Sequence, residues 1–239
     1  MDWRNKQVVV MGGSSGVGEA TARRLVAQGA RVVITGRDAD KLARVATSLG
    51  AQARGVVVDG TNATAVRAFF AELGAFDHLV VCLSGAEGAG AFRDLDLAGL
   101  RRGFEAKFWA HLTVVQAALG TLRPDGSVTL VTAASARTAF AGASGLAAIN
   151  GALEAMVPPL ALELAPLRVN AVSPGVINTP WWDKAPAAQR DAIFATSAAT
   201  LPVRRVGTPE DVADAIVFVA GNGFMTGTVI ECDGGARLA

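Results

Sequence analysis

Residues 11–18 combine glycine and serine in an order that suits the binding of phosphate groups. The run Met-Gly-Gly-Ser-Ser-Gly-Val-Gly lies between a β-branched run at 8–11 and a helical stretch that begins near residue 19. Glycines permit a tight turn there, and the N–H groups at the start of the helix can face a pyrophosphate. The strand–turn–helix context favours a dinucleotide site over an ordinary loop. The residues of this turn that are predicted to bind the cofactor are Gly12, Ser14, Ser15, Gly16, Val17 and Gly18.

Polar residues at the ends of the next two expected strands extend this prediction. Arg37 is the first polar side chain after Gly36, at the point where an acidic residue would pair with the ribose diol of NAD(H). An arginine there suits a 2′-phosphate, so the sequence favours NADP(H), and the neighbouring Asp38 keeps NAD(H) as the alternative. Asp59, with Gly60 beside it, is placed to hydrogen-bond the adenine amino group, or else acts as a simple cap.

Strand-like and helix-like segments alternate along the whole chain. Fully apolar strands separated by helices indicate a parallel sheet that is covered on both faces. We therefore expect one α/β domain over 1–239, a doubly wound Rossmann-type fold. The expected strands are 8–11, 31–35, 55–58, 78–83, 127–132, 168–172 and 229–232, and the expected helices are 19–28, 40–49, 63–73, 100–119, 145–164 and 209–219. The least regular segment is expected to form a loop-and-helix flap at about 176–208.

Composition argues against several classes of protein. An apolar content of 51% is too high for a disordered chain, and a net charge of +1 provides no field that would draw the protein to nucleic acid. Glycine, proline or a charge interrupts every long apolar run, which argues against membrane spans. Cys82 and Cys232 lie in strand-like runs and the two histidines are far apart, so we expect reduced thiols and no metal site. We expect a cytoplasmic protein that acts on a small molecule.

These features together resemble the short-chain dehydrogenase/reductase family from the first strand to the C-terminus. The resemblance implies about seven parallel strands, a homotetramer or homodimer, and a dinucleotide cofactor. It also places Ser84 and Gly85 in the family's Asn-Ala-Gly segment, with Leu83 instead of the asparagine. The residues implied at the nicotinamide end are Pro174, Gly175, Ile177 and Thr179. The motifs that carry the resemblance are the glycine-rich turn, Asp59, Leu162–Leu164, Arg168–Gly175, Asn178–Pro180, Gly207–Ala213 and Thr226–Gly235.

The catalytic positions of the family are changed in this chain. The sequence contains no tyrosine, whereas the family uses a tyrosine and, four residues later, a lysine on one helix face. Counting along the motifs places Leu146 and Asn150 at those two positions. Ala133 occupies the position of the family's serine, with Ser135 close by, and Lys107 replaces an asparagine that bends the preceding helix. The cofactor motifs are therefore retained, but the usual proton donor is not.

Lys107 and His111 could supply the missing chemistry. They are four residues apart, so they share a helix face, and the resemblance implies that this face borders the active site. We expect Lys107 to be a substitute acid or cation and His111 its partner, because a buried lysine can donate a proton near neutrality. Ser135 and Asn150 complete the predicted polar set. The alternative is that Lys107 bonds main-chain carbonyls and His111 lies between helices.

Two adjacent tryptophans mark the start of the flap. Trp181 and Trp182 follow Thr179-Pro180. Their rings could cover an aromatic or alicyclic substrate, or else pack the flap or a subunit contact.

The sequence leaves three functions open. The first, which the motifs favour, is an NADP(H)-dependent oxidoreductase that acts on a carbonyl or alcohol with a rearranged acid. The second is a catalytically silent dinucleotide-binding protein, either a sensor or a structural partner. The third is a non-redox enzyme that reuses the same pocket, since fold alone does not choose among them.

Overall fold

A seven-stranded parallel sheet forms the centre of the molecule. The computed structural model describes residues 2–85 and 87–238. The strands lie in the order β3-β2-β1-β4-β5-β6-β7, and every neighbouring pair is parallel. This confirms the predicted doubly wound α/β fold. The strands are β1 (Gln7–Met11), β2 (Arg31–Gly36), β3 (Ala53–Val57), β4 (Phe76–Val81), β5 (Leu122–Val131), β6 (Arg168–Pro174) and β7 (Val229–Cys232).

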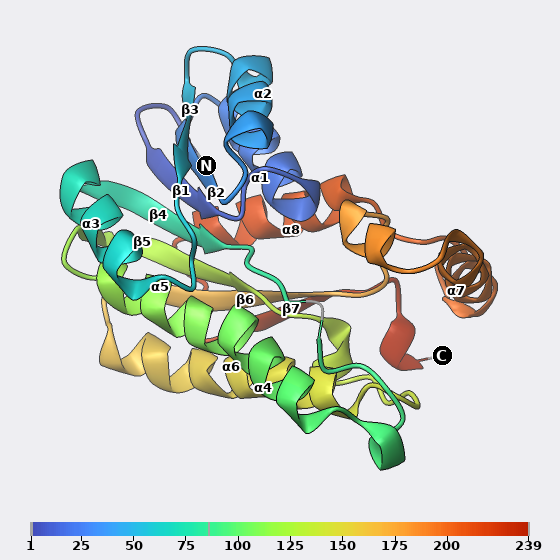
Figure 1. Cartoon of the computed structure of the whole chain (residues 1–239). Helices are drawn as coiled ribbons and strands as arrows, with labels where there is room; N and C mark the ends of the chain where they lie inside the picture. Colours follow the sequence, from blue (N-terminus) through green and yellow to red (C-terminus); the bar gives the residue numbers. More distant parts are fainter. Residues whose placement is uncertain (1, 86, 239) are drawn as a thin grey trace.

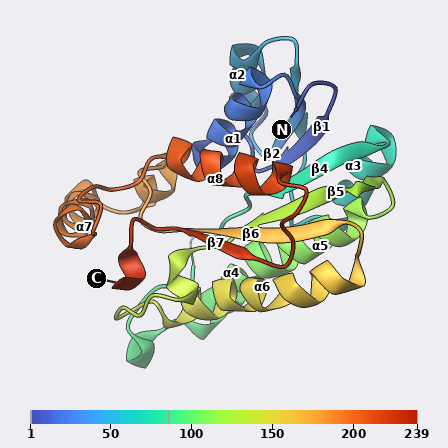
Figure 2. The ribbon, with the colours of Figure 1, turned by 180° about the vertical axis from the view of Figure 1, so that it is seen from behind.

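Helices cover both faces of this sheet (Figures 1 and 2). Successive side chains of β1 alternate between two apolar cores: Val8 and Val10 lie in one, and Val9 and Met11 in the other. The first core packs on α1, α2 and α8, and the second on α3, α5 and α6. The helices are α1 (Gly16–Ala27), α2 (Ala39–Leu49), α3 (Ala63–Leu73), α4 (Leu97–Phe104), α5 (Ala110–Ala118), α6 (Ser144–Glu163), α7 (Ala187–Thr200) and α8 (Pro209–Gly221).

The helix expected over 100–119 differs from the prediction. It consists of α4 and α5 joined by a π-helical turn, Glu105–Trp109. A π turn adds a residue to the helical repeat and bends the path, a feature that often occurs at functional sites. Lys107 lies within this turn, so its side chain leaves the helix where the geometry is irregular.

The crevice of the fold lies between β1 and β4. These strands are neighbours in the sheet, yet the chain leaves β1 toward α1 on one face and leaves β4 toward α4 on the other. Ligands of open α/β sheets bind beyond the carboxyl ends of the strands at such a switch point. We call this region the crevice.

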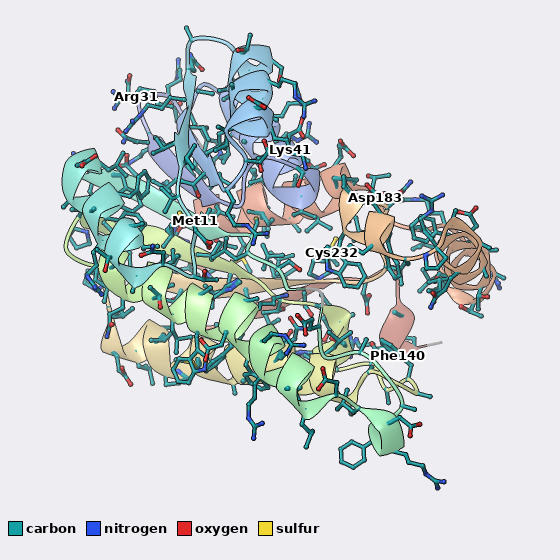
Figure 3. The ribbon with its side chains drawn as sticks, in the orientation of Figure 1. Met11, Arg31, Lys41, Phe140, Asp183 and Cys232 are labelled. Atoms are coloured by element: carbon teal, nitrogen blue, oxygen red, sulfur yellow. The ribbon has the colours of Figure 1, made fainter. Side chains whose placement is uncertain are left out.

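The predicted flap over 176–208 contains a 3-10 turn, Pro180–Lys184, and helix α7. Its base is held where Ile177 pairs with Gly207 in an isolated parallel bridge. Helix α7 contributes no buried residue and projects away from the sheet in both ribbon views (Figures 1 and 2). In Figure 3, Asp183 of the flap and Phe140 of the loop before α6 lie on either side of Cys232, the last residue of β7.

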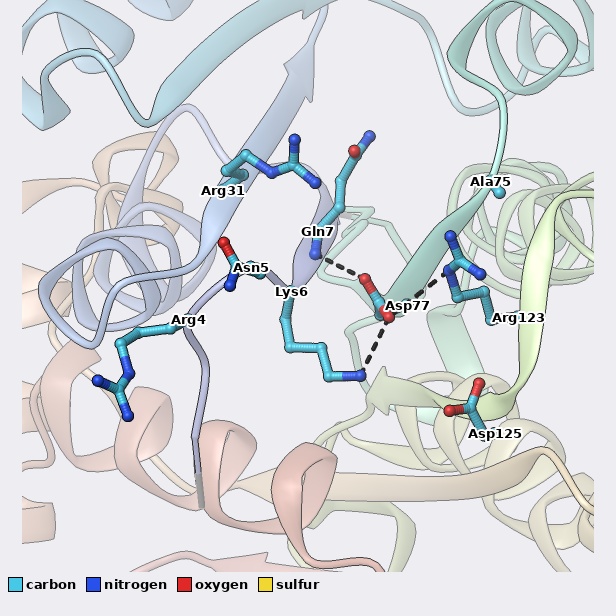
Figure 4. A pocket seen from close by; sticks show the side chains of 9 residues that line it. All are labelled: Arg4, Asn5, Lys6, Gln7, Arg31, Ala75, Asp77, Arg123 and Asp125. Carbon is cyan, nitrogen blue, oxygen red and sulfur yellow. Dashed lines mark hydrogen bonds and ion pairs between the residues drawn. The ribbon is translucent and has the colours of Figure 1, made fainter.

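The opposite, amino-terminal edge of the sheet carries a polar hollow of about 310 Å³ (Figure 4). Asp77 lies at its centre and accepts hydrogen bonds from the main-chain N–H of Gln7 at 2.8 Å and from Lys6 Nζ at 3.2 Å. Burial alone would raise the pKa of the Asp77 carboxyl, but these two donors outweigh it and hold the pKa below its usual value. The hollow lies far from the crevice, and Asp77 ties the start of β1 to the start of β4.

Among the described helices, α6 is long and apolar enough to cross a membrane by length and composition. Its residues Leu153, Val157 and Ala161 are buried within the protein, and Val157 and Ala161 pack with the residues of β6 in one core. A helix that is buried in a protein core can meet the same criteria of length and composition as a membrane-spanning helix.

Candidate active site

The glycine-rich turn has the geometry of a phosphate cradle. Gly12 has φ +83° and Gly16 has φ +53°, a region that favours glycine. A Cβ on Gly18 would lie 2.1 Å from the carbonyl oxygen of Gly12, so the turn folds back tightly on itself. Helix α1 begins at Gly16, and the first N–H groups of a helix have no intrahelical acceptor. The turn therefore presents open donors at the crevice, which fits a pyrophosphate.

The end of β2 places a cation beside this turn. A Cβ on Gly36 would lie 2.8 Å from Ser14 Oγ, which brings the serine hydroxyl against the strand end that carries Arg37. The Arg37 side chain is exposed, whereas Asp38 caps α2 by accepting from Lys41 N at 3.0 Å. That main-chain hydrogen bond lowers the pKa of the Asp38 carboxyl. Asp38 thus caps helix α2, whereas the Arg37 side chain makes no hydrogen bond or ion pair among the residues that the structure describes.

Asp59 is held rigidly after β3. Its Oδ1 accepts from the main-chain N–H of Thr61 at 3.0 Å and from Thr61 Oγ1 at 2.8 Å. The main-chain bond is the largest cause that lowers the pKa of this carboxyl, and Arg37 adds to it. A Cβ on Gly60 would lie 2.4 Å from Leu83 Cδ1, so the leucine side chain packs closely over this glycine. The Asp59 carboxylate is therefore held by two donors and ionised at the end of β3.

The end of β6 packs closely on the C-terminal segment. A Cβ on Gly175 would lie 2.8 Å from the Cα of Asp233, and Gly175 N donates to the carbonyl oxygen of Cys232 at 3.1 Å. Pro174 is buried at the strand end, and Ile177 is buried at the base of the flap. These contacts aim the backbone after β6 toward the crevice.

Lys107 is a buried lysine at the centre of the site. Its side chain is nearly inaccessible, and Nζ donates to the carbonyl oxygen of Thr132 at 3.1 Å. Burial lowers the pKa of this amine to about 8, and the nearby Cys82 and Glu154 partly oppose that fall. The hydrogen bond matches the alternative use of Lys107 noted from the sequence, but the lowered pKa also suits an acid that works near neutral pH.

His111 lies below Lys107 and is fully buried. Its Nδ1 is 2.7 Å from the carbonyl oxygen of Lys107, and its Nε2 is 3.2 Å from that of Val81. Burial lowers the pKa of the ring to about 3, so the ring is neutral and carries one N–H. That hydrogen is donated to one of the two carbonyls. The ring joins the π turn to the end of β4 and thereby supports the backbone that carries Lys107.

Asn150 and Ser135 meet on the floor of the site. Asn150 Nδ2 donates to the carbonyl oxygen of Leu146 at 2.9 Å and to Ser135 Oγ at 3.2 Å. The buried Asn150 Oδ1 has no hydrogen-bond partner among the residues that the structure describes. An acceptor of this kind suits a ligand hydroxyl. Leu146 and Ala133 are half-buried, and their side chains have no proton to donate.

A buried carboxylate was not predicted from the sequence. Glu154 Oε1 accepts from Thr132 Oγ1 at 2.8 Å, and Oε2 accepts from Arg137 Nε at 2.6 Å. Arg137 also reaches Glu231 of β7 at 3.2 Å. Thr132 therefore links Glu154 to Lys107, since its hydroxyl bonds the carboxylate and its carbonyl bonds the amine. The sequence feature that could have revealed Glu154 is its spacing, since it lies four residues after Asn150 and therefore on the same helix face.

The two tryptophans of the flap make different bonds. Trp181 Nε1 donates to the carbonyl oxygen of Gly85 at 3.0 Å, across 96 positions of sequence. Trp182 Nε1 donates to the carbonyl oxygen of Ile177 at 2.9 Å, within the flap itself. The ring of Trp182 also packs edge-on against Phe194 of α7 at 5.5 Å between centroids. Both tryptophans thus hold the flap in place. Of the two, Trp181 is the one that joins the flap to the loop after β4.

A comparison with protein families matches residues 12–237 to the family model described as enoyl-(acyl carrier protein) reductase. The match covers the phosphate turn, the π turn and the flap.

Characterised relatives and solved structures match along the whole chain. A cis-4-hydroxycyclohexanecarboxylate dehydrogenase of Sinomonas cyclohexanicum is 35% identical, over 95% of this chain and 94% of the relative. A (2S)-[(R)-hydroxy(phenyl)methyl]succinyl-CoA dehydrogenase subunit, BbsD, of Thauera aromatica is 32% identical, over 100% of this chain and 99% of the relative. A crystal structure of a small-chain dehydrogenase in complex with NADPH is 33% identical, with a TM-score of 0.85 over 98% of this chain and 99% of that one.

Proposed function

The chain belongs to the short-chain dehydrogenase/reductase family of oxidoreductases, and from that premise we propose that it is an NADP(H)-dependent enzyme that interconverts a carbonyl and an alcohol with Lys107 as the acid. The single observation that carries the proposal is the buried amine of Lys107, whose pKa is lowered to about 8 at the crevice of a retained dinucleotide fold.

The cofactor half of the proposal rests on the turn and on the ends of β2 and β3. The open N–H groups at the start of α1 would hold the pyrophosphate, and Ser14 and Arg37 would hold a 2′-phosphate. Asp59 would accept from the adenine amino group, and Asn150 Oδ1 from a ribose hydroxyl. A relative of known structure is described in complex with NADPH, which supports the choice of NADP(H) over NAD(H).

The acid half of the proposal concerns the proton on Lys107 Nζ. The hydride would come from, or pass to, a dinucleotide held in the crevice. Lys107 holds the proton that passes to the substrate oxygen on reduction and takes it back on oxidation. Thr132 holds the amine through its carbonyl oxygen. A pKa near 8 leaves much of the amine protonated at neutral pH, so proton donation is matched to that range.

Binding and turnover together test this function. Fluorescence titration with NADPH and NADH measures the dinucleotide site, and a hydride-transfer screen over ketones and alcohols measures the reaction. A cyclohexanone carboxylate belongs in that screen, because one relative is described as acting on a hydroxycyclohexanecarboxylate. The expected result is tighter binding of NADPH and measurable oxidation of NADPH. Binding without turnover over the whole screen would reject the oxidoreductase proposal.

A second candidate function is a catalytically silent partner subunit. Leu146 and Ala133 at the usual acid positions favour it, and one relative is described as a subunit of a dehydrogenase. The triple variant Ala133→Ser, Leu146→Tyr and Asn150→Lys separates the two candidates. Ketone reduction by the variant alone, with an inactive wild type, would support the silent subunit. For the enzyme we propose a homodimer or homotetramer in the cytoplasm.

A further inference from the structure

The flap touches both walls of the crevice. On one wall, a Cβ on Gly16 would lie 3.3 Å from Thr179 Cβ and 3.8 Å from Pro180 Cδ, so the flap lies directly over the phosphate turn. On the other wall, Trp181 Nε1 donates to the carbonyl oxygen of Gly85 at 3.0 Å. Gly16 follows β1 and Gly85 follows β4, which are the two strands that border the crevice. The segment 179–181 therefore crosses the crevice from one wall to the other.

The two ends of the flap are anchored, whereas helix α7 between them is not buried. Asn178 N donates to the carbonyl oxygen of Gly207 at 2.9 Å, and Gly207 N donates to that of Val176 at 3.0 Å. These paired main-chain bonds hold the two ends of the flap together. Helix α7 beyond them buries no residue, and segments with few buried contacts open at low cost. The Trp181 bond ties the segment 179–181 to the loop after β4, so this segment can move away from that wall of the crevice only when the bond is broken.

We propose that Trp181 is the latch of the flap: its indole N–H fastens the flap to the Gly85 carbonyl across the crevice, so that this bond breaks each time a dinucleotide enters or leaves. The inference rests on the proposed function only in requiring a dinucleotide in the crevice, and it holds for a silent binding protein as well. It assigns Trp181 a role in the rates of binding and release that differs from covering the substrate.

Trp182 provides a matched control. It has the same side chain, one position further on, and its indole N–H also makes one hydrogen bond to a main-chain carbonyl. That acceptor belongs to Ile177 in the flap's own base, so the bond does not cross the crevice. Replacement of either tryptophan by phenylalanine keeps an aromatic ring and removes only the donor. A difference between the two variants therefore reports the crossing bond.

Stopped-flow fluorescence of NADPH measures the two rates directly. In W181F we expect association and release of NADPH each to rise about fivefold, which corresponds to the loss of one hydrogen bond of about 1 kcal/mol net. The dissociation constant then changes little, because both rates rise together. In W182F we expect both rates to remain within about twofold of wild type, by the same reasoning. Unchanged rates in W181F, or an equal rise in W182F, would overturn the latch.

Indole hydrogen exchange provides a second measurement that needs neither turnover nor a bound dinucleotide. The chain has four tryptophans, and the W181F spectrum identifies the missing indole signal. With the latch closed, the Trp181 indole N–H of the wild-type protein should exchange more slowly than that of the exposed Trp109. Exchange as fast as that of Trp109 would overturn the proposal. A protein that does not transfer hydride could still be tested by the NADPH binding rates and by indole exchange. The latch and the proposed function can therefore be refuted independently of each other.

Discussion

Replacement of Lys107 by methionine should make the protein more stable. Methionine has a similar length and no charge, so the change removes the cost of burying an ammonium group. Burial lowers the pKa of Lys107 from its usual 10.5 to about 8. At about 1.4 kcal/mol per unit of pKa, the charged form costs the folded state about 3 kcal/mol at neutral pH. The lost hydrogen bond to Thr132 offsets about 1 kcal/mol of this, so we expect a net gain of about 2 kcal/mol.

The gain should depend on pH in a defined direction. Between about pH 8 and pH 10.5 the unfolded lysine binds a proton that the folded one does not, so the stability of the wild type rises with pH in that window. The advantage of K107M is therefore complete below about pH 8 and shrinks as the pH approaches 10.5. For a chain of this size, about 2 kcal/mol corresponds to a rise in Tm of about 4–8 °C at neutral pH.

Urea unfolding at neutral and alkaline pH measures this difference. Lys184→Met is the control, because Lys184 is exposed on the 3-10 turn of the flap. We expect no comparable gain in that variant. A K107M protein that is less stable than wild type at neutral pH, or a difference that does not change with pH, would refute the reasoning. Either result would mean that the amine is not held as a buried cation.

Two further predictions concern the ends of the sheet. Replacement of Arg37 by serine should weaken NADPH binding by about 10- to 100-fold, because one charge-assisted hydrogen bond is lost. In the same fluorescence titration, NADH binding should remain nearly unchanged. Equal losses of affinity for NADPH and NADH would contradict a contact between Arg37 and the 2′-phosphate. Replacement of Asp77 by asparagine should lower the unfolding free energy at neutral pH by about 1–3 kcal/mol, because Lys6 and the N–H of Gln7 lose a charged acceptor. The pKa of Asp77 is depressed in the fold, so this contribution is present above its unfolded pKa and is lost as the pH falls through the folded pKa. The difference from wild type should therefore vanish in acid, and a gap that persists there would contradict the assignment.

The sequence predicted most of the architecture, because local patterns determine it. Seven apolar runs separated by helical segments indicate a covered parallel sheet, and the glycine-rich turn marks its first crossover. The expected strand ranges differ from the observed ones by a few residues at their ends, except for β5, which begins at Leu122, five residues before the expected start. The apolar repeat predicted one helix over 100–119 and gave no sign of the π turn at Glu105–Trp109, although the resemblance marked the position of Lys107 as the place where the family's helix bends.

The candidate site was predicted in part, because some of its contacts join distant segments. The positions of Leu146 and Asn150 follow from counting along one helix. The bond from Trp181 to Gly85 and the link from Glu154 through Thr132 to Lys107 require the folded chain, since no sequence spacing brings those residues together. The roles of Lys107, His111, Ser135 and Asn150 in catalysis stay predictions.

The pH dependence of a single turnover tests the role of Lys107 most directly. NADPH oxidation by a reactive ketone would be followed with enzyme in excess, in the wild type and in K107M, with NADPH binding measured in parallel. The account predicts a wild-type rate that falls as the pH rises through about 8, where the buried amine loses its proton. It also predicts a K107M variant that binds NADPH normally and has lost this step. A K107M rate equal to that of the wild type over the same pH range would contradict it.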